Sequence, residues 1–320
     1  MALHEDGFSD RVARARARYG AHRIAVILGT STSGVLAAED AYRARGPDGA
    51  LPPGFDYRGT QDLHSLAGMV RAALFLRGPS IVISTACASS ARAFMDAANM
   101  IRAGLCDAAI VGGADTLCRM TLQGFQALEL ISPGPCTPCG ADRTGISIGE
   151  AAGFALLEPE AGADTILSLL GAGASSDGHH MSAPHPEGQG AAAAMRHAID
   201  AAGLDPAEID WINLHGTGTR ANDAAEDRAV AAIFADAVPC SSTKGWTGHT
   251  LGACGILETV IAAEAIDHAF IPGCLGIEQP DPAFRAQVAT TTIPRRIRRV
   301  LSNSFGFGGI NCSLVLGHPA

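Results

Sequence analysis

The sequence is poor in lysine, in aromatic residues and in positive charge. Lys244 is the only lysine among 320 residues, aromatic side chains make up 5% of the chain, and the formal net charge is -9. Because nucleic-acid binding relies on a surplus of basic side chains, this balance argues against a nucleic-acid partner. Since arginine supplies nearly every other basic position, Lys244 is a candidate for a specific role that an arginine could not fill.

The sequence also lacks a long apolar run and a cysteine framework. No stretch approaches the roughly 20 apolar residues of a membrane span, and the polar N-terminus lacks the apolar segment of a signal peptide. The nine cysteines are odd in number and irregularly spaced, which predicts no disulfide framework and a reducing, cytoplasmic location. The lone pair Cys136 and Cys139 has no second pair nearby, so no metal site is expected.

What the chain does contain is abundant apolar material in short runs, with 47% hydrophobic residues. Helices are predicted at 1–20, after residue 87, at 191–202 and at 256–266. Strands are predicted at 23–29, 80–85, 108–112, 153–157, 166–170, 211–214, 238–242, 300–303 and 312–317. Strands that alternate with helices indicate an α/β fold with a largely parallel sheet. Because the pattern recurs, we expect two similar halves, residues 1–160 and 161–320.

Cys87 stands between a predicted strand and the start of a predicted helix. The partial positive charge at a helix N-terminus stabilises a thiolate, and the neighbouring residues 85–90 are small enough to let a bulky thioester approach. Cys87 is therefore either a structural cysteine or a nucleophile for acyl transfer.

Two histidines in the second half, like Cys87, lie next to predicted strands or helices. His215 follows the predicted strand 211–214, and His249 lies in a Gly- and Thr-rich segment before the predicted helix 256–266. Either histidine alone could be a satisfied core residue. Because ligands of open α/β sheets bind at the carboxyl ends of strands, we expect the two to share a crevice. A cysteine with imidazoles nearby suits acyl transfer.

Three further features bear on this crevice. Lys244 lies five residues before His249, and Glu226 lies eleven residues after His215. A buried Lys–Glu pair could orient a histidine, although Lys244 could also lie on a surface loop. The Gly-rich segment 302–312 could aim backbone N–H groups at an oxyanion, although alone it indicates only a tight turn.

Together these segments resemble the β-ketoacyl-(acyl carrier protein) synthases of the I/II type, which are condensing enzymes of the thiolase fold. The resemblance extends from residue 23 to the end of the chain. It rests on four motifs in the family's order: TACASS (85–90), NLHGTGTRANDAAED (213–227), STKGWTGHTLGACG (242–255) and NSFGFGG (303–309). It implies two duplicated α/β halves in a layered α-β-α-β-α architecture.

The resemblance implies a role for each matched residue. Cys87 would be the acylated nucleophile. His215 and His249 would hold and polarise the malonyl thioester carbonyl during decarboxylation. Lys244 and Glu226 would fix the geometry of the site.

It implies further roles around the nucleophile. Thr217 and Thr219 would bind the phosphopantetheine arm. The backbone amides of Cys87 and Phe307 would form the oxyanion hole, and Phe305 and Phe307 would gate the acyl tunnel.

The implied reaction is a decarboxylative Claisen condensation with malonyl thioester in fatty acid, polyketide or polyene biosynthesis. It needs no metal or redox cofactor. The implied partners are an acyl carrier protein and a second subunit, either identical or a related ketosynthase-like chain.

The resemblance also leaves alternatives. The N-terminal half would lack the family's first strand, which we expect to be central to its sheet, so that ladder hydrogen bonds would be unmade. A non-catalytic chain-length factor that pairs with a ketosynthase is the main competing interpretation. Such partners usually lack the nucleophile, whereas this chain has Cys87 and both histidines. A thiolase, a type III synthase with Cys-His-Asn, and a cysteine hydrolase are weaker alternatives.

Overall fold

A computed structural model of the chain describes residues 3, 5–162 and 165–318, so residues 1, 2 and 4 of the predicted helix 1–20 lie outside the described part. Within these ranges, no helix combines the length and the apolar character needed to cross a membrane.

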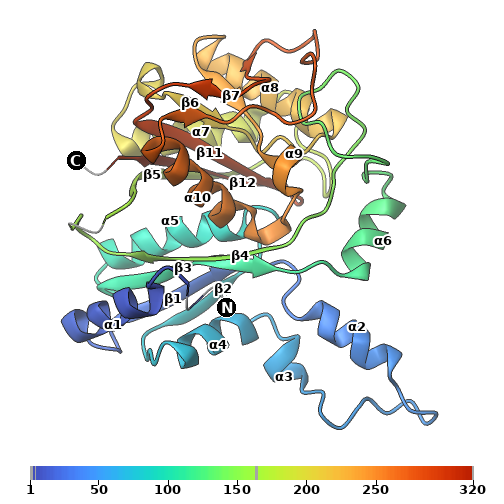
Figure 1. Ribbon diagram of the computed structural model, residues 1–320, viewed down its shortest axis with the longest axis vertical. Helices are drawn as coiled ribbons and strands as arrows, with labels where there is room; N and C mark the ends of the chain where they lie inside the picture. Colours follow the sequence, from blue (N-terminus) through green and yellow to red (C-terminus); the bar gives the residue numbers. More distant parts are fainter. Residues whose placement is uncertain (1–2, 4, 163–164, 319–320) are drawn as a thin grey trace.

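Two mixed β-sheets form the body of the protein (Figure 1). The first has the order β2 (Ser80–Ile83), β1 (Ile24–Gly29), β3 (Ala108–Asp115), β4 (Ala151–Leu157). The second has the order β5 (Ser168–Ser176), β12 (Ile310–Gly317), β11 (Arg299–Gly306), β6 (Trp211–Asn213), β7 (Pro239–Ser241), β9 (Gln287–Val288). A separate antiparallel pair joins β8 (Phe270–Ile271) and β10 (Ile293–Pro294).

Helices cover both sheets and fill the space between them (Figure 1). They are α1 (Phe8–Tyr19), α2 (Val35–Arg43), α3 (Tyr57–Thr60), α4 (Ser65–Ala73), α5 (Ser89–Arg102), α6 (Arg119–Ala127), α7 (Gln189–Ala202), α8 (Arg220–Phe234), α9 (Lys244–Thr247) and α10 (Cys254–Asp267), with short 3₁₀ turns at Pro206–Glu208 and Leu251–Ala253.

The layers follow from where each helix buries its apolar side. Helices α5 and α10 lie between the sheets, where Phe94 and Ile256 pack with Val111 and Val300 of the two central strands. Helices α1 and α4 pack on the outer face of the first sheet, and α7 and α8 on the outer face of the second. The predicted α-β-α-β-α layering is confirmed.

The two sheets show the predicted internal repeat. The series β1, α4, β2, α5, β3, β4 corresponds to β6, α8, β7, α10, β11, β12, with the last strand of each series antiparallel to its neighbour. The sheets draw their strands from either side of residue 160, and the boundary itself stays a prediction.

The expectation of a gap in the middle of the first sheet is wrong. In the second half, β5 precedes the repeated series and bonds only to the outer edge of β12, so it is an edge strand. The equivalent place in the first half is the outer edge of β4, at which the described sheet ends. The central strands β1 and β3 pair in full register, and every residue of β1 is buried.

Candidate active site

Cys87 lies in the turn between β2 and α5, two residues before the helix begins. Burial raises the pKa of the Cys87 thiol to about 12, while the Lys244 charge and the backbone N–H groups of Phe307 and Cys87 act to lower it. Loss of solvation outweighs the Lys244 charge and the N–H groups, and the stabilisation of a thiolate by the helix N-terminus stays a prediction. The resting side chain is a thiol.

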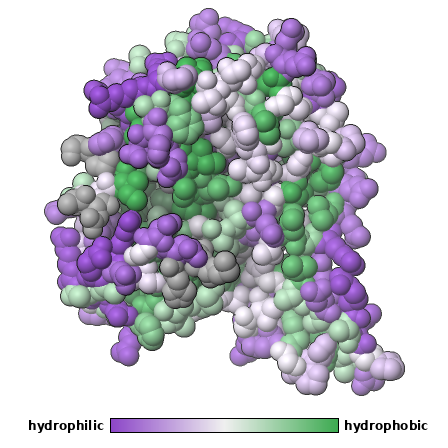
Figure 2. Space-filling model, in the orientation of Figure 1, coloured by the Kyte–Doolittle hydropathy of each residue, from purple (hydrophilic) through white to green (hydrophobic). Residues whose placement is uncertain are grey.

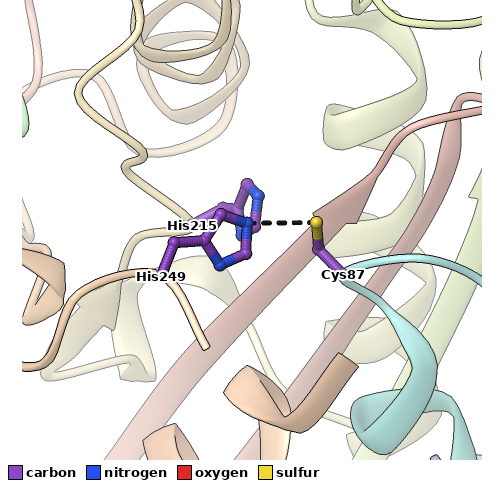
Figure 3. A group of neighbouring side chains, drawn as sticks. All are labelled: Cys87, His215 and His249. Atoms are coloured by element: carbon purple, nitrogen blue, oxygen red, sulfur yellow. Dashed lines mark hydrogen bonds between the residues drawn. The ribbon is translucent and has the colours of Figure 1, made fainter. Parts of the chain in front are cut away.

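The structure brings Cys87, His215 and His249 together (Figure 3). The Nε2 atom of His249 lies 3.0 Å from Cys87 Sγ, and one donor atom of each side chain lies within 4.8 Å of the other two. The two imidazole rings meet edge to face, with centroids 5.2 Å apart and an angle of 83°. The shared crevice predicted for the two histidines is present, although its residues come from both halves.

The backbone decides which nitrogen of His249 carries the proton. The N–H of Leu251 donates to His249 Nδ1 over 3.2 Å. Burial, together with the Lys244 charge, lowers the pKa of His249 well below its ordinary value, so the ring is neutral. Because Nδ1 accepts a hydrogen bond, the single ring proton lies on Nε2 and points toward Cys87.

This proton position bears on whether the cluster could hold a metal. A cysteine and two histidines at this spacing are a suitable set of zinc ligands. A metal ion would need the lone pair of His249 Nε2 and would move the proton to Nδ1, where it would face the N–H of Leu251. The local hydrogen bonding therefore disfavours a metal at this position.

His215 is held through its main chain. Its N–H and that of Gly216 each donate to the Glu226 carboxylate over 2.8 Å, and Asn303 Nδ2 donates over 3.1 Å. Burial raises the pKa of Glu226 to about 7 against these hydrogen bonds. Burial and, after it, the Lys244 charge lower the pKa of His215 well below its ordinary value, so this ring is neutral too. Its Nδ1 has no hydrogen-bond partner among the described residues.

Lys244 forms its ion pair with Glu258 of α10. The expectation that Lys244 pairs with Glu226 is therefore wrong. The Glu226 carboxylate already accepts hydrogen bonds from three donors. Burial opposes the charge of Lys244, but the Glu258 carboxylate holds its pKa above the ordinary value. The single lysine is 1% exposed and not on a surface loop.

A cavity of about 660 Å³ opens onto the three side chains. Its lining includes Thr217, Thr219, Phe305 and Phe307, the residues expected at the phosphopantetheine arm and the gate. Near Phe307 the wall is apolar, because the Phe125 ring of α6 lies with its centroid 5.5 Å from that of Phe307. The cavity thus offers a polar side and an apolar side to a thioester.

Two family profiles match the chain. The N-terminal domain of β-ketoacyl synthases matches residues 1–163, and the C-terminal domain matches residues 167–278. The chain belongs to the β-ketoacyl synthase family. Membership confirms the predicted enzyme class, a condensing acyltransferase, and a non-catalytic partner is not favoured.

Relatives of this β-ketoacyl synthase align over most of its length. Nodulation protein E of Rhizobium sp. (strain N33) is 36% identical over 92% of this chain and 75% of its own. The 3-oxoacyl-[acyl-carrier-protein] synthase 2 of Rhizobium meliloti (strain 1021) is 36% identical over 91% of this chain and 73% of its own length. A solved structure of a ketosynthase from Xenorhabdus doucetiae, in complex with its chain length factor, matches with a TM-score of 0.89 and 44% identity. The match covers 96% of this chain and 77% of the chain in that structure.

Sequence reasoning missed two polar residues that support this synthase site, Glu258 and Asp223. Glu258 lies within the apolar helix α10, where its carboxylate is buried against Lys244. Asp223 accepts the N–H groups of Thr217, Gly218 and Cys139, which shapes the loop that carries the two threonines.

Proposed function

We propose that Cys87 takes up an acyl group and that His215 and His249 then promote decarboxylation of a malonyl thioester at the same place. The observation that carries this proposal is the contact between Cys87 Sγ and the protonated Nε2 of His249, in a cavity that both neutral histidines border. A neutral imidazole with its N–H pointing into the cavity is a hydrogen-bond donor to a carbonyl or enolate oxygen.

In the first step, the sulfur of Cys87 attacks the carbonyl carbon of an acyl thioester. The developing oxyanion takes hydrogen bonds from the backbone N–H groups of Cys87 and Phe307, which already face the sulfur. The carrier thiolate leaves and takes the proton that the Cys87 thiol gives up. The acyl group is then held on the protein, and the apolar side of the cavity receives its chain.

In the second step, a malonyl thioester places its carbonyl oxygen against the two histidines. The bond between the malonyl carboxylate and its methylene carbon breaks, CO2 leaves, and the electron pair forms an enolate. The enolate carbon attacks the acyl carbonyl and expels the Cys87 thiolate, which regains a proton from solvent. No electron is lost or gained overall, so the reaction needs no redox cofactor, and the N–H groups proposed to bind the oxyanion and the enolate oxygen do what a metal would otherwise do.

The proposed partners are a phosphopantetheine-bearing carrier protein and a second subunit of the same fold. The Rhizobium meliloti relative is named for an acyl carrier protein, and the Xenorhabdus ketosynthase occurs with a chain length factor. Figure 2 shows a band of apolar residues over α6, where Met120, Leu122 and Leu128 are 56%, 40% and 52% exposed. A second subunit over this band would cover the helix that carries Phe125 into the cavity.

The proposal is tested by acyl loading. Purified protein is mixed with a medium-chain acyl-carrier protein, and intact mass with peptide mapping locates the adduct. We expect one acyl group on Cys87 and none on a Cys87→Ala variant. A Cys312→Ala variant is the matched control, because that thiol is also fully buried with a pKa raised to about 12 but does not line the cavity. Undiminished loading of Cys87→Ala would refute the nucleophile.

A further inference from the structure

We infer that Asp115 is a positioning residue for His249, which it controls by fixing the turn that follows the histidine. The inference rests on the proposed role of His249 as a donor through Nε2. Asp115 lies at the end of β3 in the first half, whereas His249 belongs to the second half. The carboxylate therefore reaches across the contact between the two halves.

The Asp115 carboxylate is a buried hub of hydrogen bonds. Its side chain is 2% exposed. On one side it accepts from the three residues that follow β1. Thr30 Oγ1 donates over 2.7 Å, and the N–H and the hydroxyl of Thr32 each donate over 2.8 Å. The N–H of Ser31 donates over 2.9 Å and its hydroxyl over 2.6 Å. On the other side the carboxylate accepts from Gly252 N at 2.6 Å. The donors from Thr30 to Thr32 hold the carboxylate in place, and the carboxylate in turn holds Gly252.

The backbone around Gly252 shows how closely this contact is built. A Cβ atom added at Gly252 would lie 2.7 Å from Asp115 Oδ2 and 2.8 Å from Ser31 N, closer than real Cβ contacts. The preceding residue, Leu251, has a φ of 54°, in the left-handed region that a leucine rarely adopts. A strained residue of this kind persists only when its surroundings hold it, and the Asp115–Gly252 bond is one such restraint.

The strained turn has a direct consequence for His249. It is the N–H of Leu251 that donates to His249 Nδ1 and so places the ring proton on Nε2. If Gly252 is released, Leu251 can relax and its N–H turns away from the ring. The proton is then free to move to Nδ1, and Nε2 has no hydrogen left to donate to the enolate oxygen.

The loading step does not need this proton. Loading depends on the Cys87 sulfur and on the backbone N–H groups of Cys87 and Phe307. The Asp115 charge acts on this step only by raising the pKa of the Cys87 thiol, so its loss would not slow loading. The loss of Asp115 should therefore slow decarboxylation much more than loading. If Asp115 merely joined the two halves, its loss would instead lower the rates of both steps together.

The experiment uses an Asp115→Asn variant, which keeps the size of the side chain but replaces an acceptor oxygen with an amide NH2 that can only donate. We expect decarboxylation of malonyl-carrier protein to fall roughly 10–100-fold in kcat, with KM and acyl loading within about 3-fold of the unaltered protein. Nitrogen-15 NMR of the imidazoles, with His249 assigned from a His249→Ala spectrum, should show its Nδ1 gaining a proton.

An Asp227→Asn variant is the matched control. Asp227 is a buried aspartate that also accepts two backbone N–H groups, from Arg285 and Ala286, but it does not line the cavity. We expect it to leave the tautomer and both rates unchanged. If Asp115→Asn does not fold, Ser31→Ala, which removes the 2.6 Å bond to the carboxylate, should show the same shift to a smaller degree.

An unchanged tautomer in a folded Asp115→Asn protein would overturn the inference, as would equal losses in loading and decarboxylation. Failure of the proposed function would look different. In that case His249→Ala would decarboxylate at the unaltered rate, while the NMR spectrum would still report whether Asp115 sets the tautomer.

Discussion

Lys244 and Glu258 form an ion pair whose side chains are 1% and 3% exposed. The Lys244 charge acts on all three side chains of the proposed site. It opposes the raised pKa of Cys87 and adds to the lowering of the pKa of His215 and of His249. Glu258 supplies the countercharge that keeps the buried ammonium in place. The pair therefore links the stability of the fold to the protonation of the site.

We predict that Glu258→Gln destabilises the protein by about 3–5 kcal/mol, because it leaves the ammonium of Lys244 buried without a countercharge. Denaturant unfolding measures the loss. Glu264→Gln is the control, since Glu264 lies on the same helix but its side chain is 63% exposed. Unfolding of Glu258→Gln at the denaturant concentration of the unaltered protein would show that the pair contributes little.

A second prediction concerns the pH dependence of Cys87 alkylation. Because burial raises the pKa of the thiol to about 12, its reaction with iodoacetamide should still accelerate as the pH rises past 9, the ordinary value. In the window from 9 to about 12, the unfolded chain loses this proton while the folded chain keeps it. The group therefore lowers the free energy of unfolding as pH rises through that window.

Peptide mass spectrometry on briefly alkylated protein measures the rate at Cys87 alone. A free thiol compound in the same tubes is the control and should level off near its own pKa. A plateau for Cys87 at neutral pH would mean that the resting side chain is a thiolate after all.

The sequence predicts the residues proposed to do the chemistry and, with Glu226 and Lys244, part of what holds them, whereas Glu258 and Asp115 could not be predicted. Cys87, His215 and His249 stand at the ends of apolar runs or in Gly-rich segments, and these local patterns are visible in one dimension. Glu258 is paired through a contact between α9 and α10 that no spacing specifies. Asp115 ends a predicted strand, but its donors from 30–32 and 252 meet only when the two halves pack.

For the fold as well, local features could be predicted from the sequence and long-range contacts could not. All nine predicted strands are present, because short apolar runs are a local property of the sequence. The order of strands within a sheet depends on long-range pairing, so the edge position of β5 could not be read from the sequence.

We predict that His249→Ala slows decarboxylation by roughly 10²–10³-fold, because one donor to the developing enolate oxygen is lost. Acyl loading should fall by less than about 10-fold, since the oxyanion of that step takes its hydrogen bonds from backbone N–H groups. Release of CO2 from malonyl-carrier protein and intact mass after loading measure the two steps separately. His268→Ala, with a 62% exposed ring, is the control. Equal losses in both steps would count against the assigned role.

The last prediction concerns the outer edge of β4. Strand β12 forms ladders on both edges, with β11 and β5, whereas the described part of the chain pairs β4 only with β3. Backbone N–H groups without a ladder partner exchange with solvent more readily. Hydrogen exchange followed by mass spectrometry should therefore show faster uptake of deuterium in residues 151–157 than in 310–317.

The comparison is internal, since the two strands hold equivalent places in their sheets. Strand β4 is bonded on one side to β3, and β12 is bonded on one side to β11. Both partners are long and mostly buried, so the burial of the partner strand should not by itself make exchange faster in β4 than in β12. A synthetic extended peptide that protected 151–157 but not 310–317 would show that the edge accepts a further strand, as β12 accepts β5. Equal protection of the two segments in the purified protein would instead mean that another chain already covers the edge of β4.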